Sequence, residues 1–232
     1  MGNYFDVGYL IKSFPSILSY VHITLLITLV AVVVGIIIGS IIAAVRVLKI
    51  KTLNMAAIVY ISFFRGTPFL VQLFLIFFGL PELLQKLGYP GVREIPALFY
   101  VFIVFALHFG AYSAEIMRSA IMAVEPGQLE AAYSIGMNMR QAYMRIILPQ
   151  ALRLANPALC NNIIGTLKET SLVFNVGIID MMHKADLMSA NSHRSLELYL
   201  DVAAIYIILV VIISKLAALL EIKTSGVLSE EA

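Results

Sequence analysis

Long apolar runs alternate with short polar segments along the whole chain, and the apolar runs carry almost no charge. A helix needs about 20 predominantly apolar residues to cross a bilayer, because its backbone groups must be satisfied internally across the whole hydrocarbon layer. Five runs reach this length. We therefore predict an all-α integral membrane protein with five transmembrane helices, at about residues 17–45, 54–80, 95–121, 151–180 and 198–221.

The composition also indicates a membrane protein. Of the 232 residues, 61% are hydrophobic and 13% are charged, whereas soluble domains carry about 25% charged residues. The net charge of +2 gives no reason to expect nucleic acid as a partner. A lone cysteine, Cys160, excludes an internal disulfide and a cysteine-based metal cluster, and we predict no metal site. No linker or repeat interrupts the sequence, so residues 1–232 are expected to form a single domain.

The positions of Lys and Arg predict the orientation, because these residues favour the cytoplasmic side of a membrane. The connection between the first two spans carries Arg46, Lys49 and Lys51 without an acidic residue. The connection between the third and fourth spans is also basic, with Arg118, Arg140, Arg145 and Arg153 in it or beside it. The other two connections mix both signs of charge. We therefore predict that the N-terminus lies outside, and that the C-terminus and segment 125–149 lie in the cytoplasm.

The N-terminal part is expected to stay in place. Residues 1–12 are not basic, and no small-residue cleavage site follows them, so the first apolar run is expected to persist as a helix. We interpret Ser13 to Ser19, which precede this run, as an interfacial lead-in to the first span.

Segment 125–149 is amphipathic. Its apolar residues recur at helical spacing: Ala131, Ala132, Ile135, Met139, Ala142, Ile146 and Ile147. Gly136 interrupts this pattern, and a glycine inside a helix costs about 1 kcal/mol relative to alanine. We therefore predict an elbow between two helices at Gly136. Pro149 is expected in the first turn of the following helix, where its missing N–H does no harm.

This segment resembles the EAA motif of ABC importer permeases, spacing included. The matching residues are Glu130, Ala131, Ala132, Gly136, Ile146, Leu148 and Pro149. In that family the motif forms a coupling helix that docks onto a separate ATPase subunit, so the resemblance assigns these residues to ATPase coupling. We refer to residues 125–149 as the coupling segment. The alternative is a surface helix that only links two spans.

The second predicted span contains a polar interruption, Arg65-Gly66-Thr67-Pro68, followed by Val71-Gln72. Pro68 removes a backbone donor and crowds the preceding turn, so the helix is expected to loosen here. Charged residues at membrane depth are functional candidates by default. The stretch resembles a signature of the polar amino acid branch of ABC permeases. The alternative is a structural kink in which Arg65 pairs with a neighbouring carboxylate.

The third predicted span carries His108, followed by Gly-Ala-Tyr and Ala-Glu-Ile elements that also resemble this branch. His108 falls where related permeases often carry a small polar residue that faces the substrate. A satisfied core histidine is the alternative. Glu115 and Arg118 are three residues apart on one helix face, so we predict a structural ion pair between them.

The fourth predicted span ends in Lys168-Glu169-Thr170-Ser171-Leu172. Lys168 and Glu169 are about 100° apart around a helix, so they cannot share one face. Related permeases carry a similar stretch, and their acidic position helps to bind the substrate's ammonium group. The resemblance thus assigns the ammonium group to Glu169. The alternative is a Lys–Glu pair that closes the helix bundle.

A zwitterionic amino acid needs a partner for each of its charges, because an unpaired buried charge is very costly. Glu169 is the candidate for the ammonium group. Thr67, Ser171, His108 or the loosened backbone near Gly66 are the candidates for the carboxylate.

Together the resemblances imply the permease subunit of a polar amino acid ABC importer in a bacterial cytoplasmic membrane. A weaker similarity points to cystine-type importers, and basic amino acids or glutamine are equally allowed as substrates. The family implies a second permease copy, identical or a sister chain, an ATPase dimer and an extracytoplasmic solute-binding protein. The chain has no phosphate-binding loop, so ATP and Mg²⁺ are expected on the ATPase and this chain is not expected to be an enzyme. The alternative is an ion-gradient-driven amino acid transporter in which Lys168, Glu169 and His108 form a relay.

Overall fold

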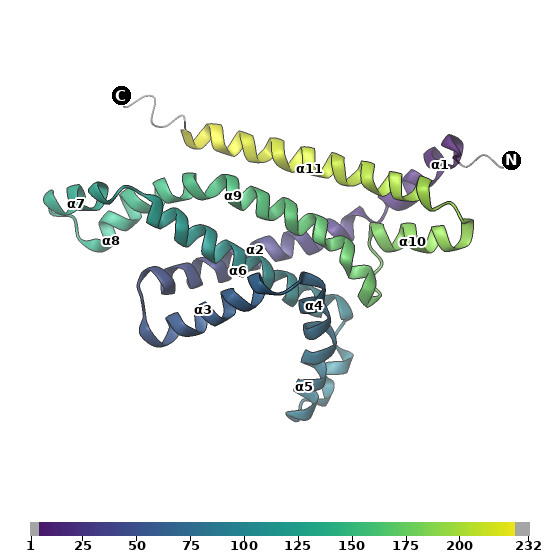
Figure 1. Cartoon of the computed structure of the whole chain (residues 1–232), viewed down its shortest axis with the longest axis horizontal. Helices are drawn as coiled ribbons and strands as arrows, with labels where there is room; N and C mark the ends of the chain where they lie inside the picture. The colour runs from purple at the N-terminus through teal and green to yellow at the C-terminus, as the bar shows by residue number, and fades with distance from the viewer. Residues whose placement is uncertain (1–4, 226–232) are drawn as a thin grey trace.

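The computed structural model describes residues 5–225. Its elements in this range are helical, without a strand. Long helices lie side by side, with α7 and α8 at one end of the molecule and α1 and α10 at the other (Figure 1). The α-helices are α1 Val7–Leu18, α2 Val21–Val47, α3 Lys51–Gly66, α4 Phe69–Phe74, α5 Leu80–Lys86, α6 Ala97–Ala123, α7 Pro126–Ser134, α8 Met139–Ala142, α9 Leu148–Glu169, α10 Met181–Ser192 and α11 Ser195–Ser225. The π-helical segments are η1 Leu75–Gly79 and η3 Tyr143–Ile147, and the 3₁₀ segments are η2 Pro90–Glu94 and η4 Thr170–Val176.

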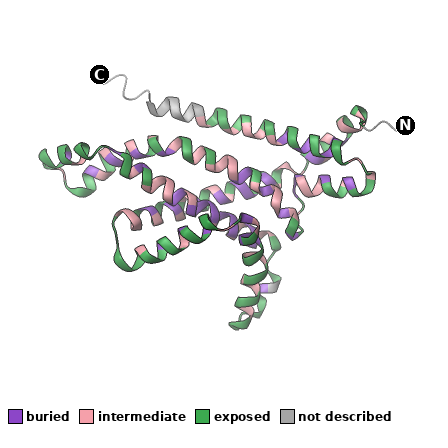
Figure 2. Ribbon diagram, in the orientation of Figure 1, coloured by how far each residue is buried: buried purple, intermediate pink, exposed green. Residues whose placement is uncertain are grey.

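The centre of the bundle is the close contact between α2 and α6. A Cβ added at Gly35 would lie 2.7 Å from Phe109 Cδ1, and one at Gly39 would lie 2.8 Å from Ser113 Cβ. Two glycines four residues apart let the backbones of two membrane helices approach each other closely. Buried residues gather in the interior of the bundle (Figure 2). The core beside the α2–α6 contact includes Ile27, Leu73, Val101, Phe105 and Val173.

The outer faces of the long helices are apolar although they are exposed. On α2 the exposed fractions are 60% for Leu29, 57% for Ile37 and 61% for Ile41. Such faces suit lipid, because a soluble protein rarely exposes large contiguous apolar patches. By length and hydropathy, the candidate membrane spans in the described chain are Val21–Val47, Phe69–Lys86, Ala97–Ala123 and Ser195–Ala217. The helix of the predicted fourth span, α9, is absent from this set, since it carries several polar residues.

The predicted second span, 54–80, is not one helix. The chain breaks at Thr67, whose backbone is extended (φ −119°, ψ 149°). Pro68 explains the break, because a proline disfavours helical backbone at the preceding residue. α3 ends at Gly66 and runs beside the bundle, whereas α4 and α5 turn away and project from it (Figure 1). This corrects the sequence interpretation, which allowed only for a loosened helix.

The predicted first span, 17–45, begins later than expected. A break at Ser19 and Tyr20 separates α1 from α2, which starts at Val21. Apart from Ser19, the residues interpreted as an interfacial lead-in belong instead to α1, which packs on α11. Ser13 is buried, and its Oγ donates to Asp201 Oδ2 at 2.6 Å. Ile17 is also fully buried there. The lead-in is thus part of the packed structure.

The predicted elbow at Gly136 is confirmed. α7 ends at Ser134, and Gly136 has φ +77°, a left-handed conformation that suits glycine. Asn138 then caps α8 through a reciprocal capping box with Gln141. Pro149 falls in the first turn of α9, as predicted, but the helical path continues from α8 through η3 into α9. The wider turn accommodates the proline, because the Leu148 N–H donates to Tyr143 O, five residues back.

Candidate substrate-binding site and coupling segment

Gln72 is fully buried in α4, and its side chain bridges the break between α3 and α4. Its Nε2 donates to Phe64 O at 2.8 Å, to Thr67 O at 2.9 Å and to Thr67 Oγ1 at 2.9 Å. Backbone carbonyl oxygens only accept hydrogen bonds, so these contacts fix the orientation of the amide. The Oε1 atom of Gln72 must then point away from the break, toward α6.

This orientation determines the tautomer of His108 on α6. His108 Nδ1 lies 2.7 Å from Gln72 Oε1. Because an amide oxygen only accepts, Nδ1 must carry the hydrogen. In a neutral ring the other nitrogen, Nε2, is then an acceptor. His108 is buried, with an exposed fraction of 5%, so water does not offer an easy alternative partner.

Glu169 faces that free nitrogen. His108 Nε2 lies 3.5 Å from Glu169 Oε2, and this carboxylate oxygen is buried without a hydrogen-bond partner among the described residues. With a neutral His108, two acceptors face each other and lack a donor between them. With a protonated His108, they form an ion pair. Either a proton or an external N–H donor completes the arrangement.

The pair lines a cavity of about 300 Å³ between α6 and α9. Other lining residues are Tyr112, Asn161, Gly165 and Thr166. A cavity of this size matches the smaller end of known small-molecule sites. Its walls combine one carboxylate with neutral polar groups, which suits a small cationic or zwitterionic guest.

Thr67, Gly66 and Arg65 do not line this cavity. Thr67 is joined to His108 through Gln72, and its own hydroxyl donates to Phe63 O at 2.8 Å. Gly66 is exposed at the last position of α3. The Arg65 guanidinium lies over the ring of Tyr112, 5.6 Å from its centroid, and forms no ion pair within the described chain. The alternative of a carboxylate-paired Arg65 is therefore not what the structure contains.

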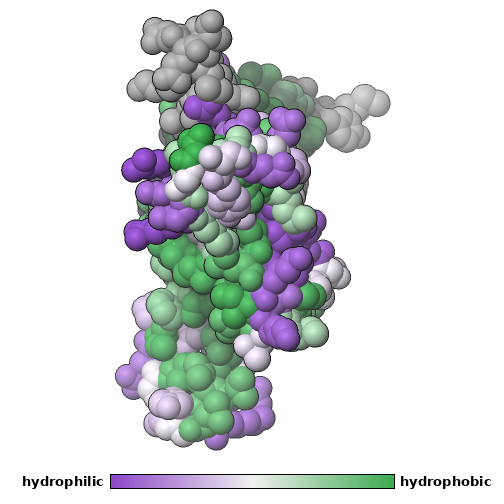
Figure 3. All heavy atoms as spheres, turned by 90° about the vertical axis from the view of Figure 1, so that its left-hand side faces the viewer, coloured by the Kyte–Doolittle hydropathy of each residue, from purple (hydrophilic) through white to green (hydrophobic). Residues whose placement is uncertain are grey.

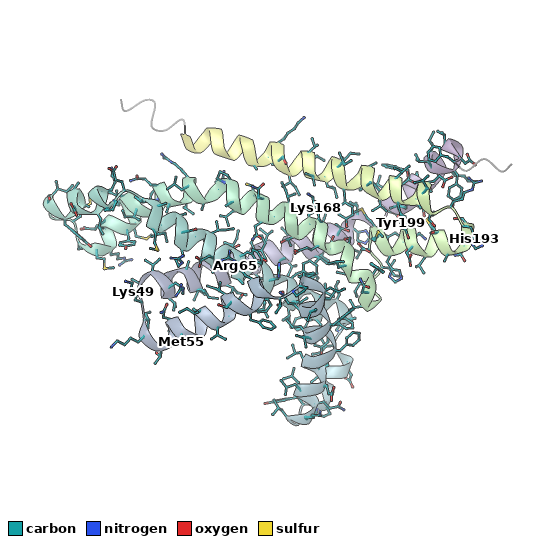
Figure 4. All side chains as sticks on the ribbon, viewed as in Figure 1. Lys49, Met55, Arg65, Lys168, His193 and Tyr199 are labelled. Carbon is teal, nitrogen blue, oxygen red and sulfur yellow. The ribbon has the colours of Figure 1, made fainter. Side chains whose placement is uncertain are left out.

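Ser171 does not lie with Glu169. Its hydroxyl donates to Lys168 O at 2.8 Å, and both residues line a separate cavity of about 290 Å³ that faces α11 and includes Tyr199. Figure 4 shows Lys168 directed from α9 toward α11. Lys168 and Glu169 thus serve different cavities, in agreement with their predicted separation around the helix.

The sequence matches the family model for the inner membrane component of binding-protein-dependent transport systems over residues 32–225. The chain belongs to this family. The permease is 41% identical over 219 residues to a probable amino-acid ABC transporter permease protein of Vibrio harveyi, covering 94% of this chain and 96% of that one. It is 39% identical to an L-cystine transport system permease protein of Bacillus subtilis, with 89% and 86% coverage. These matches identify the chain as an amino-acid-type permease of an ABC importer. It is therefore a transport component and a multi-pass membrane protein.

The fold agrees with solved structures. The permease superposes on a chain from the crystal structure of an amino acid ABC transporter with histidines, with a TM-score of 0.81, 37% identity and coverage of 94% of this chain and 99% of that chain. A chain of the MetNI methionine ABC transporter in an inward-facing conformation gives a TM-score of 0.73 at 17% identity, which supports the fold alone.

The coupling segment of the permease combines an exposed face with a small-residue core. Glu130 and Ala131 are exposed on α7, whereas Ala132 is buried with an exposed fraction of 1%. Ile146 packs against a cluster formed by α6, η3 and α9. Leu148 is half-buried in the first turn of α9, and Pro149 is exposed. The segment is thus anchored on one side and free on the other.

Gln72 is a candidate site residue to which the sequence analysis assigned no role. It is the last residue of the Val-Gln pair, but an uncharged residue on an apolar helix gives no sign in the sequence of its four hydrogen-bond contacts. Glu115 and Arg118, by contrast, form the predicted ion pair, with Arg118 Nε 3.0 Å from Glu115 Oε2.

Proposed function

We propose that this permease translocates a polar L-amino acid across the bacterial cytoplasmic membrane, as the membrane-spanning part of an ATP-driven importer. Similarity to amino-acid ABC permeases over most of the chain supports this class. The complex would contain two permease copies, two ATPase subunits carrying ATP and Mg²⁺, and an extracytoplasmic solute-binding protein. Transport would proceed by alternating access, with the spans moving as rigid bodies between two states.

The observation that carries the substrate class is the Gln72–His108–Glu169 arrangement. An ammonium group brings three N–H donors, and the space between His108 Nε2 and Glu169 Oε2 lacks a donor. We assign the ammonium group to Glu169 and His108 together, which moves His108 from the carboxylate to the ammonium end. Arg65, at the edge of the cavity over Tyr112, is the cationic candidate for the carboxylate.

The coupling segment would dock on the ATPase through its exposed face. It lies at the same end of the molecule as the α2–α3 turn with Lys49, and both are predicted to be cytoplasmic (Figure 4). The basic residues of the turn and the position of the coupling segment favour the same orientation. Five membrane crossings, with α9 as the fourth, fit this topology, because a helix that lines a polar cavity in a bundle need not be apolar all round.

The test is uptake into proteoliposomes that contain the purified complex. We expect uptake of a labelled amino acid from a panel of L-cystine, L-arginine, L-histidine and L-glutamine to require ATP inside and binding protein outside. ATP-independent uptake that follows a proton or sodium gradient would instead support the alternative, an ion-driven transporter. The facing acceptors His108 and Glu169 are the observation that favours that alternative, since they can hold a proton.

The assembly is tested separately. The tagged chain is purified from its native membrane in mild detergent, and co-purifying proteins are identified by mass spectrometry. A stoichiometric ATPase with a phosphate-binding loop is expected, and a second permease would show a heterodimer. A folded chain without an ATPase would contradict the proposal.

A further inference from the structure

Two adjoining cavities at the end of α2 have opposite character. The first, of about 690 Å³, is lined by Arg46, Lys49, Lys51 and Arg118. The second, of about 430 Å³, is lined by residues such as Ala44, Leu48 and Met144 and is almost entirely apolar. Val47, Ile121 and Tyr143 line both cavities, so the two compartments share a wall. Neither belongs to the candidate amino acid site.

The first cavity has an excess of positive charge. Among the described side chains, Arg46, Lys49 and Lys51 form no ion pair with a carboxylate. Arg46 donates from Nη1 to Asn54 Oδ1 at 3.0 Å, while its Nε is buried without a hydrogen-bond partner in that range. Arg118 is already paired with Glu115. Three cations, one with an unused buried donor, therefore surround a space that an anion would fill.

The surroundings favour an amphiphile over a soluble anion. Exposed apolar residues flank the cations, with exposed fractions of 53% for Leu48, 41% for Ile50 and 53% for Leu53. Figure 3, which looks onto this end of the molecule, shows hydrophilic residues beside hydrophobic surface. Apolar side chains next to Lys and Arg at the end of a long apolar helix are typical of a membrane interface. An acyl chain would find the second cavity directly behind the charged one.

We propose that these two cavities bind one anionic phospholipid, with its phosphate at Arg46, Lys49 and Lys51 and an acyl chain against Val47, Ile121 and Tyr143. Tyr143 belongs to η3, in the coupling segment, and Met144 extends the apolar wall from the same element. The lipid would thus join the α2–α3 turn to the coupling segment. This site is independent of the amino acid that the permease carries.

The test is native mass spectrometry of the full-length permease, purified with its co-purifying partners and supplied with phosphatidylglycerol or phosphatidylcholine. We expect phosphatidylglycerol to be retained at least tenfold better. Replacing Arg46, Lys49 and Lys51 together by Gln is expected to remove this preference. Each lost cation should lower the affinity for phosphatidylglycerol by about fivefold. Lys12→Gln, an exposed lysine on α1 at the other end, is the matched control and should leave the preference unchanged.

A single variant protects the test against misfolding. Lys49 has φ +51° at the tip of the turn, a conformation that asparagine tolerates, so Lys49→Asn removes one charge while keeping the backbone. It should weaken phosphatidylglycerol retention by about fivefold. Equal retention by the wild type and the triple variant would overturn the proposal. Displacement of the lipid by millimolar inorganic phosphate would also overturn it, because it indicates a site for a free anion. Loss of the phosphatidylglycerol preference whenever the ATPase is bound would overturn it as well, because it indicates that the cations bind an acidic protein surface.

Discussion

The tautomer of His108 is determined by Gln72, a neighbour that is distant in sequence. The Gln72 atom that faces α6 is Oε1, which accepts but cannot donate. His108 Nδ1 must therefore carry a hydrogen and donate it to Oε1. The nitrogen left over is an acceptor, and it faces a carboxylate oxygen that also lacks a donor. In the proposed binding mode, His108 therefore contacts the ammonium group of the substrate and not its carboxylate.

Two substitutions at His108 separate its two nitrogens. Asn can place a donor near the position of Nδ1 and keep the Gln72 contact, but it has nothing at Nε2. Gln can reach the position of Nε2 but loses the Gln72 contact. We therefore expect His108→Asn to raise the substrate concentration for half-maximal ATPase stimulation by about tenfold with a near-normal midpoint of thermal unfolding. His108→Gln should mainly lower that midpoint, because Gln72 Oε1 loses its hydrogen-bond donor. An unsatisfied buried acceptor costs about 1–3 kcal/mol of folding free energy. Wild-type substrate dependence in His108→Asn would leave His108 a structural residue.

Glu169→Gln tests the charge of the site. The amide keeps a similar shape and can donate to His108 Nε2, so the fold should be retained. Hydrogen bonds to charged groups contribute about 1.5–3 kcal/mol, so substrate affinity should fall by roughly 10- to 150-fold. Lys168→Gln is the matched control, because Lys168 is adjacent in sequence but lines the other cavity. If the Glu169 and Lys168 variants have equal substrate dependence in the ATPase assay, Glu169 is not a ligand.

At the scale of elements, the contact between α2 and α6 depends on the absence of side chains. Gly39→Ala improves helix propensity by about 1 kcal/mol. It nevertheless places a Cβ 2.8 Å from Ser113 Cβ and 3.1 Å from the backbone N of Ala114, which cannot move away easily. We expect the free energy of unfolding to fall by about 1–3 kcal/mol, measured from the shift of the denaturant midpoint of the purified chain. Gly79→Ala, in open space on η1, should be neutral or stabilising. A neutral Gly39→Ala would show that the helices can separate without cost.

The elbow of the coupling segment is a second element-level test. Proline fixes φ near −65°, whereas Gly136 has φ +77°, so Gly136→Pro cannot keep the angle between α7 and α8. Glu130→Lys changes only the exposed face of α7. We expect both variants to insert in the membrane but to lose co-purification with the ATPase or substrate-stimulated hydrolysis. Gly127→Ala, which has open space and no positive φ, is the control. Normal uptake by both variants would remove the coupling assignment.

At the scale of the whole molecule, the N-terminal helix is held by the last helix. Ser13 Oγ supplies a hydrogen bond to the buried Asp201, whose Oδ1 has no partner in the described chain. Ser13→Ala would leave this carboxylate without its partner, so we expect the free energy of unfolding to fall by about 1–3 kcal/mol. α1 should also become more sensitive to limited proteolysis. Ser19→Ala, at an exposed serine bonded locally to Ser16 O, should change neither measurement. Unchanged proteolysis of α1 in Ser13→Ala would show that Asp201 does not hold it.

The sequence by itself determined the class of this protein. Apolar runs predict membrane helices because lipid leaves a backbone no other partner, and the fixed offsets from Glu130 to Pro149 carry the family resemblance. The elbow at Gly136 and the choice of Glu169 as a candidate ligand also come from local pattern, since a glycine in a helix and a charge in an apolar run are visible one residue at a time.

Only the tertiary structure decided which polar groups meet. Gln72, His108 and Glu169 lie on three helices, and hydrogen-bond direction between them is a property of their packing, which linear spacing does not encode. The same packing placed Ser171 with Lys168 in another cavity and set the direction that α4 takes after the break at Pro68. A membrane helix pattern records how apolar a segment is, whereas the partner of each buried polar atom depends on the neighbouring helices.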